Sequence, residues 1–66
     1  MTLTINGKST DVPAGESVAA LLTRLGLSAQ PCAVEVNRDV VPRRQHAERV
    51  LRDGDAVEVV TLVGGG

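Results

Sequence analysis

The chain has 66 residues, of which 42% are hydrophobic, with a formal net charge of −1 and a single cysteine. Its length supports one small domain, and one cysteine excludes an internal disulfide. Charges of both signs are interspersed, Phe, Tyr and Trp are absent, and no apolar run approaches membrane length, so nothing indicates binding to nucleic acid or a membrane. A lone cysteine and no signal-type start predict a cytoplasmic protein, which we expect to be a monomer when free.

The first twelve residues predict a β-hairpin. Residues 1–5 alternate polar and apolar side chains, as a half-buried strand does. Asn6-Gly7 follows at once and favours a two-residue type I′ turn, which needs positive φ at both positions. Residues 8–12 form the expected return strand. The side chains expected to face inward are Leu3, Ile5, Thr10 and Val12.

A helix is predicted to follow Pro13 and Gly15. Ser17 is a suitable N-cap, because its hydroxyl can accept a hydrogen bond from an amide of the first turn. Gly26 is the expected left-handed residue after the helix, with Leu27 folding back over the last turn. One apolar stripe at helical spacing consists of Val18, Leu21, Leu22 and Leu25.

Two further strands are expected after a short loop at 28–31. Residues 33–36 read as a strand with Val34 and Val36 on one face. Residues 37–39 form a turn, and Val40 and Val41 make a brief second run that Pro42 ends.

The remaining residues predict a polar turn and a last strand. Residues 43–48 carry no apolar stripe, after which Val50 and Leu51 return to the core. Asp53-Gly54-Asp55 is a tight turn in which Gly54 supplies positive φ. The last strand extends from Ala56 to about Leu62, with Val57 and Val59 facing inward.

This order of elements predicts an α+β fold of the β-grasp, or ubiquitin-like, type. One helix packed across one face of a mixed sheet of four to five strands buries every apolar stripe. In this arrangement the last strand pairs parallel to the first, in the sheet centre. The domain is expected to cover residues 1–62, with a flexible glycine tail at 63–66.

The tail, Val63-Gly64-Gly65-Gly66, weakens any regular structure because glycine loses the most backbone freedom on ordering. Fully extended, it would reach roughly 13 Å, enough to enter a narrow channel in another protein. A frayed terminus or leftover linker is the alternative reading of the tail taken alone.

Six segments carry a recognisable pattern: Ile5-Asn6-Gly7, 18–27, 33–37, Val41-Pro42-Arg43, Asp53-Gly54-Asp55 and Gly65-Gly66. Together they resemble the ThiS family of sulfur carrier proteins of thiamine biosynthesis. The resemblance covers essentially the whole chain, and Val-Asn followed by Val-Pro-Arg is its most specific part. The chain departs from the family pattern at Arg38, where Gly is frequent, at His46, where Trp is frequent nearby, and by the third glycine, Gly64.

The resemblance implies a carried substrate and not an enzyme. An E1-like (ThiF-like) adenylyltransferase would use ATP with Mg to adenylate the carboxylate of Gly66. Sulfur from a cysteine desulfurase or a rhodanese-like persulfide would convert it to a thiocarboxylate, which a ThiG-like thiazole synthase would consume. No permanently bound cofactor is expected. The narrow active site of the activating enzyme would require glycine at Gly65 and Gly66, with Gly64 as a flexible spacer.

A docking face is expected on the open side of the sheet. Strand alternation turns Glu58 and Val60 away from the helix, near Val40 and Leu62, while Arg43 could steer a partner by charge. Single exposed aliphatic and arginine side chains are also common without any partner.

Three other polar features are expected to be structural. Cys32 lies between Pro31 and Ala33, which provide no charge to activate a thiol. His46 has no second ligand at metal-binding spacing, so no metal site is expected. Asp53 and Asp55 flank a turn glycine and are not interpreted as an acid–base pair.

Four alternative functions remain open at this point. The small subunit of molybdopterin synthase also ends in Gly-Gly, but those chains are usually longer and carry aromatic residues on the docking face. A carrier for another sulfur metabolite, a ubiquitin-like protein modifier and a non-covalent β-grasp binding module are the others.

Overall fold

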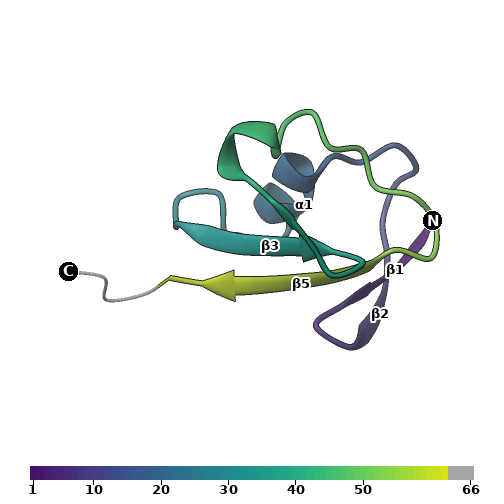
Figure 1. Cartoon of the computed structure of the whole chain (residues 1–66). Helices are drawn as coiled ribbons and strands as arrows, with labels where there is room; N and C mark the ends of the chain where they lie inside the picture. The colour runs from purple at the N-terminus through teal and green to yellow at the C-terminus, as the bar shows by residue number, and fades with distance from the viewer. Residues whose placement is uncertain (63–66) are drawn as a thin grey trace.

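The computed structural model describes residues 1–62, and they form a five-stranded mixed sheet with one helix across one face (Figure 1). The strand order is β2-β1-β5-β3-β4; β5 is central, parallel to β1 and antiparallel to β3. The α+β, β-grasp prediction is therefore confirmed, with five strands. The elements are β1 (Thr2–Ile5), β2 (Lys8–Asp11), α1 (Val18–Arg24), β3 (Cys32–Val36), β4 (Asp39–Val41), the 3-10 helix η1 (Arg43–Gln45) and β5 (Ala56–Thr61).

Two-residue turns connect both hairpins of the sheet. Ile5 pairs with Lys8 across Asn6 and Gly7, which have φ values of 50° and 81°, so the predicted type I′ geometry is confirmed. The β3–β4 hairpin closes in the same way across Asn37 and Arg38, with φ values of 51° and 72°. Arg38 thus occupies a backbone conformation that favours glycine.

The asparagines of these two turns fix the central strand from both sides. Asn6 donates from Nδ2 to the carbonyl of Val59 (3.1 Å) and accepts from its amide at Oδ1 (2.8 Å). Asn37 accepts the amide of Ala56 at Oδ1 (3.0 Å) and donates from Nδ2 to Asp55 (3.0 Å). Asn6 therefore continues the β1–β5 pairing beyond the end of β1, where the backbone has turned away.

Local signals define both ends of α1. The hydroxyl of Ser17 accepts a hydrogen bond from the amide of Ala20 (3.1 Å), so the predicted N-cap is confirmed. At the other end Gly26 has φ 76°. Its amide donates to the carbonyl of Thr23 (3.0 Å), and the amide of Leu27 donates to the carbonyl of Leu22 (2.8 Å). This pair of bonds is a Schellman motif, which turns Leu27 back against the core as expected.

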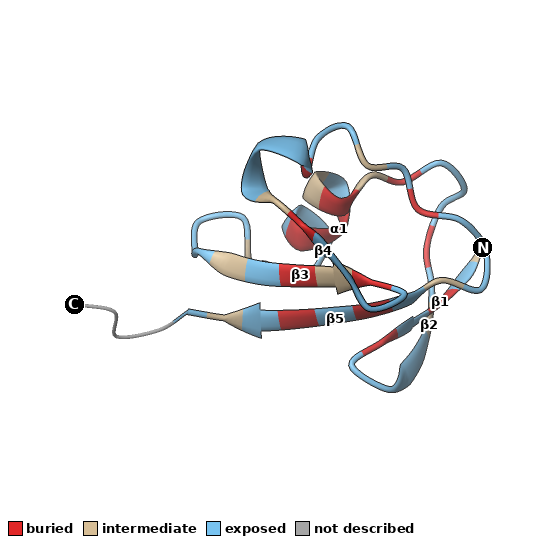
Figure 2. Ribbon diagram, in the orientation of Figure 1, coloured by how far each residue is buried: buried red, intermediate tan, exposed pale blue. Residues whose placement is uncertain are grey.

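An aliphatic core lies between α1 and the sheet (Figure 2), and it differs from the prediction at three positions. Leu25 is 38% exposed, because the helix ends at Arg24 and Leu27 covers the core instead. Val50 is 52% exposed, since neighbours in an extended segment point in opposite directions and Leu51 takes the core side. Val41, left out of the expected core, is buried. The core residues are Leu3, Ile5, Val12, Val18, Leu21, Leu22, Val34, Val36, Val41, Leu51, Val57 and Val59.

An ion pair between buried Glu16 and partly exposed Arg24 joins the segment before α1 to its last turn. Arg24 donates from Nε and Nη2 to the two carboxylate oxygens of Glu16, both at 2.9 Å. These hydrogen bonds hold the pKa of Glu16 below its usual range, against the opposing effect of desolvation. The backbone carbonyl of Glu16 also accepts the amide of Leu51 (2.8 Å), so this residue connects three segments.

Within residues 1–62 no helix has the length and hydrophobicity needed to cross a membrane.

Candidate docking face and glycine segment

The carboxyl end of β5 is the structural base of the glycine segment. β5 lies in the centre of the sheet, between β1 and β3. One residue beyond the strand, the amide of Leu62 still donates to the carbonyl of Pro31 (2.9 Å). The backbone is therefore held to the fold through the last described residue. The predicted tail with Gly64, Gly65 and Gly66, and the domain boundary before it, lie outside the described residues.

The open face of the sheet carries three of the predicted docking residues. Glu35 of β3 pairs with Glu58 of β5 on one side and with Val40 of β4 on the other, so these side chains share one face. Val60 lies on the same face opposite Ala33, two residues nearer the end of β5. Buried and exposed residues alternate along β5, as Figure 2 shows. This face is therefore the one turned away from α1.

Exposed aliphatic side chains lie at two places on this face. Val60 (58% exposed) and Leu62 (54%) are at the end of β5, and Val40 (71%) is on β4 in the row of Glu35 and Glu58. Leu62 follows Val60 by two residues and is held near Pro31 by its backbone. A cluster of this kind, next to the place where the glycine segment begins, is suited to contact with another protein.

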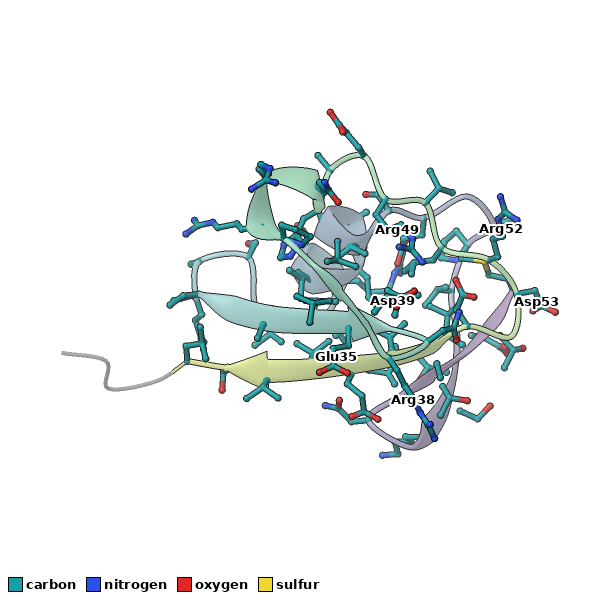
Figure 3. The ribbon with its side chains drawn as sticks, in the orientation of Figure 1. Glu35, Arg38, Asp39, Arg49, Arg52 and Asp53 are labelled. Carbon is teal, nitrogen blue, oxygen red and sulfur yellow. The ribbon has the colours of Figure 1, made fainter. Side chains whose placement is uncertain are left out.

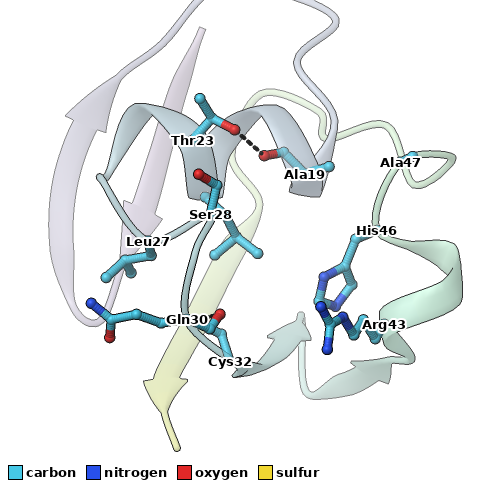
Figure 4. Close-up of a pocket in the computed structure, with 10 residues that line it drawn as sticks. Ala19, Thr23, Leu27, Ser28, Gln30, Cys32, Arg43, His46 and Ala47 are labelled. Atoms are coloured by element: carbon cyan, nitrogen blue, oxygen red, sulfur yellow. Dashed lines mark hydrogen bonds between the residues drawn. The ribbon is translucent and has the colours of Figure 1, made fainter. Parts of the chain in front are cut away.

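Arg43 lies apart from the other predicted docking residues. It lines a pocket of about 260 Å³ between α1 and η1, together with Leu22, Cys32 and His46 (Figure 4). The structure thus places Val40, Glu58 and Val60 on one face of the sheet. Arg43 lies in η1, beside the pocket that η1 and α1 line.

His46 is buried within the turn that the sequence indicated to be polar. Its Nε2 lies 3.0 Å from the carbonyl of Val41, an acceptor, so Nε2 carries the donating proton. Its own carbonyl accepts the amide of Ala19 (2.9 Å). His46 therefore joins β4 to α1. No local pattern around His46 indicated this burial, because its partners come from two different elements.

The remaining polar candidates have structural partners. The half-buried Cys32 donates its thiol proton to the carbonyl of Gln30 (3.6 Å). Asp53 accepts the amide of Thr2 (2.7 Å), and Asp55 accepts the amide of Arg52 (2.9 Å), while Gly54 has φ 87°. The prediction of turn chemistry at 53–55 is confirmed. In the part of the chain that the structure describes, no three His, Cys, Asp or Glu residues could together hold a metal ion.

A mixed sheet grasping one helix, with a central strand that leads into a glycine run, defines a ubiquitin-like protein of the β-grasp class. The model of the ThiS family matches residues 3–66. The chain belongs to the ThiS family, as its motifs indicated.

Two relatives of similar length align with this chain from end to end. The sulfur carrier protein ThiS of Escherichia coli is 30% identical, and the alignment covers all of both chains. The crystal structure of a thiamine biosynthesis protein (ThiS) from Geobacter metallireducens is 38% identical, again over all of both chains, with a TM-score of 0.85. Fold and sequence therefore agree on the family.

Other relatives are much longer proteins. The thiazole synthases of Paramagnetospirillum magneticum and Magnetococcus marinus are 41% and 38% identical over all 66 residues. The chain spans 20% of the length of each of these relatives. In both, a segment similar to this chain is thus part of the same polypeptide as a thiazole synthase.

Proposed function

We propose that this chain is a sulfur carrier for the thiazole ring of thiamine and that the carboxyl group of Gly66 carries the sulfur atom. The observation that supports this most is the family match, which extends through residue 66 and includes a full-length alignment with a protein named as a sulfur carrier. The chain acts as a substrate that other proteins activate and consume.

The proposed chemistry starts from a carboxylate, which is a poor electrophile. An oxygen of the Gly66 carboxylate attacks the α-phosphorus of ATP in an E1-like activating enzyme, and pyrophosphate leaves. Hydrosulfide then attacks the carbonyl carbon and displaces AMP, giving the thiocarboxylate directly. A persulfide from a cysteine desulfurase or rhodanese-like donor gives an acyl disulfide instead, which a thiol reduces to the thiocarboxylate. ATP and Mg belong to the partner enzyme.

The described fold fits this role in one respect. β5 is hydrogen-bonded on both sides and clamped by Asn6 and Asn37, so the segment that follows Leu62 starts from a rigid base. Side-chain-free residues at 64–66 suit passage into a narrow site. Val40, Glu58, Val60 and Leu62 form the proposed docking face beside it, and Arg43 adds positive charge at a separate place.

Blocking the terminal carboxylate tests this proposal. An alanine added after Gly66 should abolish pyrophosphate exchange by the activating enzyme of the same organism, because the side chain and the displaced carboxylate no longer fit its site. The control carries the same alanine before Met1 and should react as the unmodified chain does. Undiminished exchange with the extended carboxyl end would contradict the role of Gly66.

Thiazole synthase is the proposed recipient of the sulfur. The two relatives that combine a similar segment with a thiazole synthase support this choice over a molybdopterin-type or other recipient.

A further inference from the structure

Two carboxylates lie directly opposite each other on the docking face. Glu35 and Glu58 are partners in the antiparallel β3–β5 register, and each is flanked along its strand by buried valines. Both therefore project from the side of the sheet opposite α1; Figure 3 labels Glu35 there. Like charges at directly opposed positions destabilise an antiparallel pair. The fold thus maintains a repulsion at this point.

No cation of the described fold neutralises this pair. Within residues 1–62 the single ion pair joins Glu16 to Arg24, on a different part of the molecule. Arg38, in the neighbouring β3–β4 turn, makes no ion pair with either carboxylate. Glu58 is exposed and Glu35 half-buried, so both can be reached from outside.

The carboxylate pair has a defined position relative to the apolar side chains. Glu58, Glu35 and Val40 form one row across three neighbouring strands. Val60 and Ala33 form the next row, about 7 Å closer to the end of β5, since alternate residues of a strand are that far apart. A protein that covers the apolar row therefore brings its own surface over the carboxylates.

The charge decides what kind of surface can cover this face. A second copy of the chain docked face to face would add two more carboxylates to the two already opposed, so self-association here is disfavoured. A basic side chain, by contrast, would relieve the repulsion. The guanidinium group of arginine can donate to two carboxylates at once through its planar fork.

We propose that Glu35 and Glu58 together receive one basic side chain of thiazole synthase when that enzyme docks on the Val60–Ala33 row. This inference rests on the proposed function. It commits to thiazole synthase because similar segments occur in one polypeptide with that enzyme, which places the two at high effective concentration.

Binding of the purified full chain to thiazole synthase of the same organism, measured by calorimetry at several salt concentrations, tests the pair. Glu35→Gln and Glu58→Gln should each raise Kd roughly tenfold and flatten its dependence on salt, because each removes a charged hydrogen bond. The control is Glu48→Gln, which removes the same charge from an exposed residue after η1 and should leave Kd unchanged. The midpoint temperature of thermal unfolding of Glu35→Gln and of Glu58→Gln should be equal to or above that of the original chain.

The double variant tests whether one cation is shared. The increase in Kd of Glu35→Gln/Glu58→Gln should be smaller than the product of the increases in the two single variants, because both carboxylates contact the same group. The inference would be overturned if the increase in Kd of the double variant equalled that product. It would also be overturned if the single variants had the same Kd as Glu48→Gln. Absence of any binding of the original chain to thiazole synthase would also overturn it. The proposed function is tested separately, by measuring the thiocarboxylate on Gly66.

Discussion

Arg38 holds a long side chain where the backbone favours glycine. Its φ of 72° follows the 51° of Asn37, as the two-residue turn between β3 and β4 requires. Asparagine tolerates this region, and its side chain is used to bind Ala56. Arginine has no such compensation in the described structure. The departure from the family pattern noted in the sequence thus coincides with local backbone strain.

Replacing Arg38 by glycine should stabilise the protein. Arg38→Gly removes the steric cost of a Cβ at positive φ, part of which is offset by the entropy of glycine in the unfolded chain, leaving a gain of about 0.5–1 kcal/mol. Arg44→Gly is the matched control, since Arg44 is an exposed arginine of η1 outside the positive-φ residues, and it should destabilise. Urea unfolding measures both; a loss of stability in Arg38→Gly would show that the arginine is favourable there.

Single side chains with distant partners were the part of the structure that the sequence could not predict. Asn6 was expected to form a turn, and it does, but its hydrogen bonds to Val59 join residues 53 positions apart. His46 bonds to Val41 and Ala19 from different elements. Such pairings depend on the assembled sheet and leave no periodic pattern in the chain.

At the scale of elements, local chemistry was sufficient to predict the boundary of a helix or strand wherever a turn or a cap defined it. Ser17 and Gly26 mark the ends of α1, and Gly54 marks the last turn, because each satisfies a backbone requirement within a few residues. The errors at Leu25 and Val50 have different origins. The helix ends before Leu25, and in the extended segment Val50 points away from the core while Leu51 points into it.

The connection between Glu16 and α1 gives a prediction for pH dependence. Hydrogen bonds from Arg24 lower the pKa of Glu16 in the folded protein, so the folded state binds its proton less readily than the unfolded chain. The stability from this pair is therefore fully present above the usual glutamate pKa of about 4.3, and it is lost as the pH falls through the lowered value.

Urea unfolding of the original chain and of Glu16→Gln across this pH range measures the effect. The advantage of the original chain should be largest near neutral pH and should shrink below about pH 4. Glu48→Gln, which lacks a comparable partner, should show a smaller change. An advantage that is constant with pH would contradict the assignment of the shift to the Arg24 pair.

At the scale of the whole molecule, the fold holds the central strand β5 firmly up to the residue before the glycine segment of the sequence. The two outer hairpins each contribute an asparagine that holds β5, and the helix covers the other face of the sheet. The open face remains available, with an apolar row nearest Leu62 and a carboxylate pair beyond it. A partner on this face would therefore leave the core undisturbed.

The fold class, the order of elements and most of the core followed from the sequence, since hydrophobic alternation, Asn6-Gly7 and Gly54 all act locally. The chemistry proposed for Gly66 rests on the glycine segment and the family resemblance, and it stays a prediction. The arrangement of Glu35 opposite Glu58 did not, because strand register is a property of the assembled sheet.

The most direct test of the sulfur-carrier role is the intact mass of the protein purified from its own host without reducing or alkylating agents. A fraction of the protein should have gained mass by the exchange of one oxygen for one sulfur, with the change mapped to Gly66 by fragmentation. An unchanged mass, persisting after incubation with ATP, the host's activating enzyme and a persulfide source, would contradict the sulfur-carrier role.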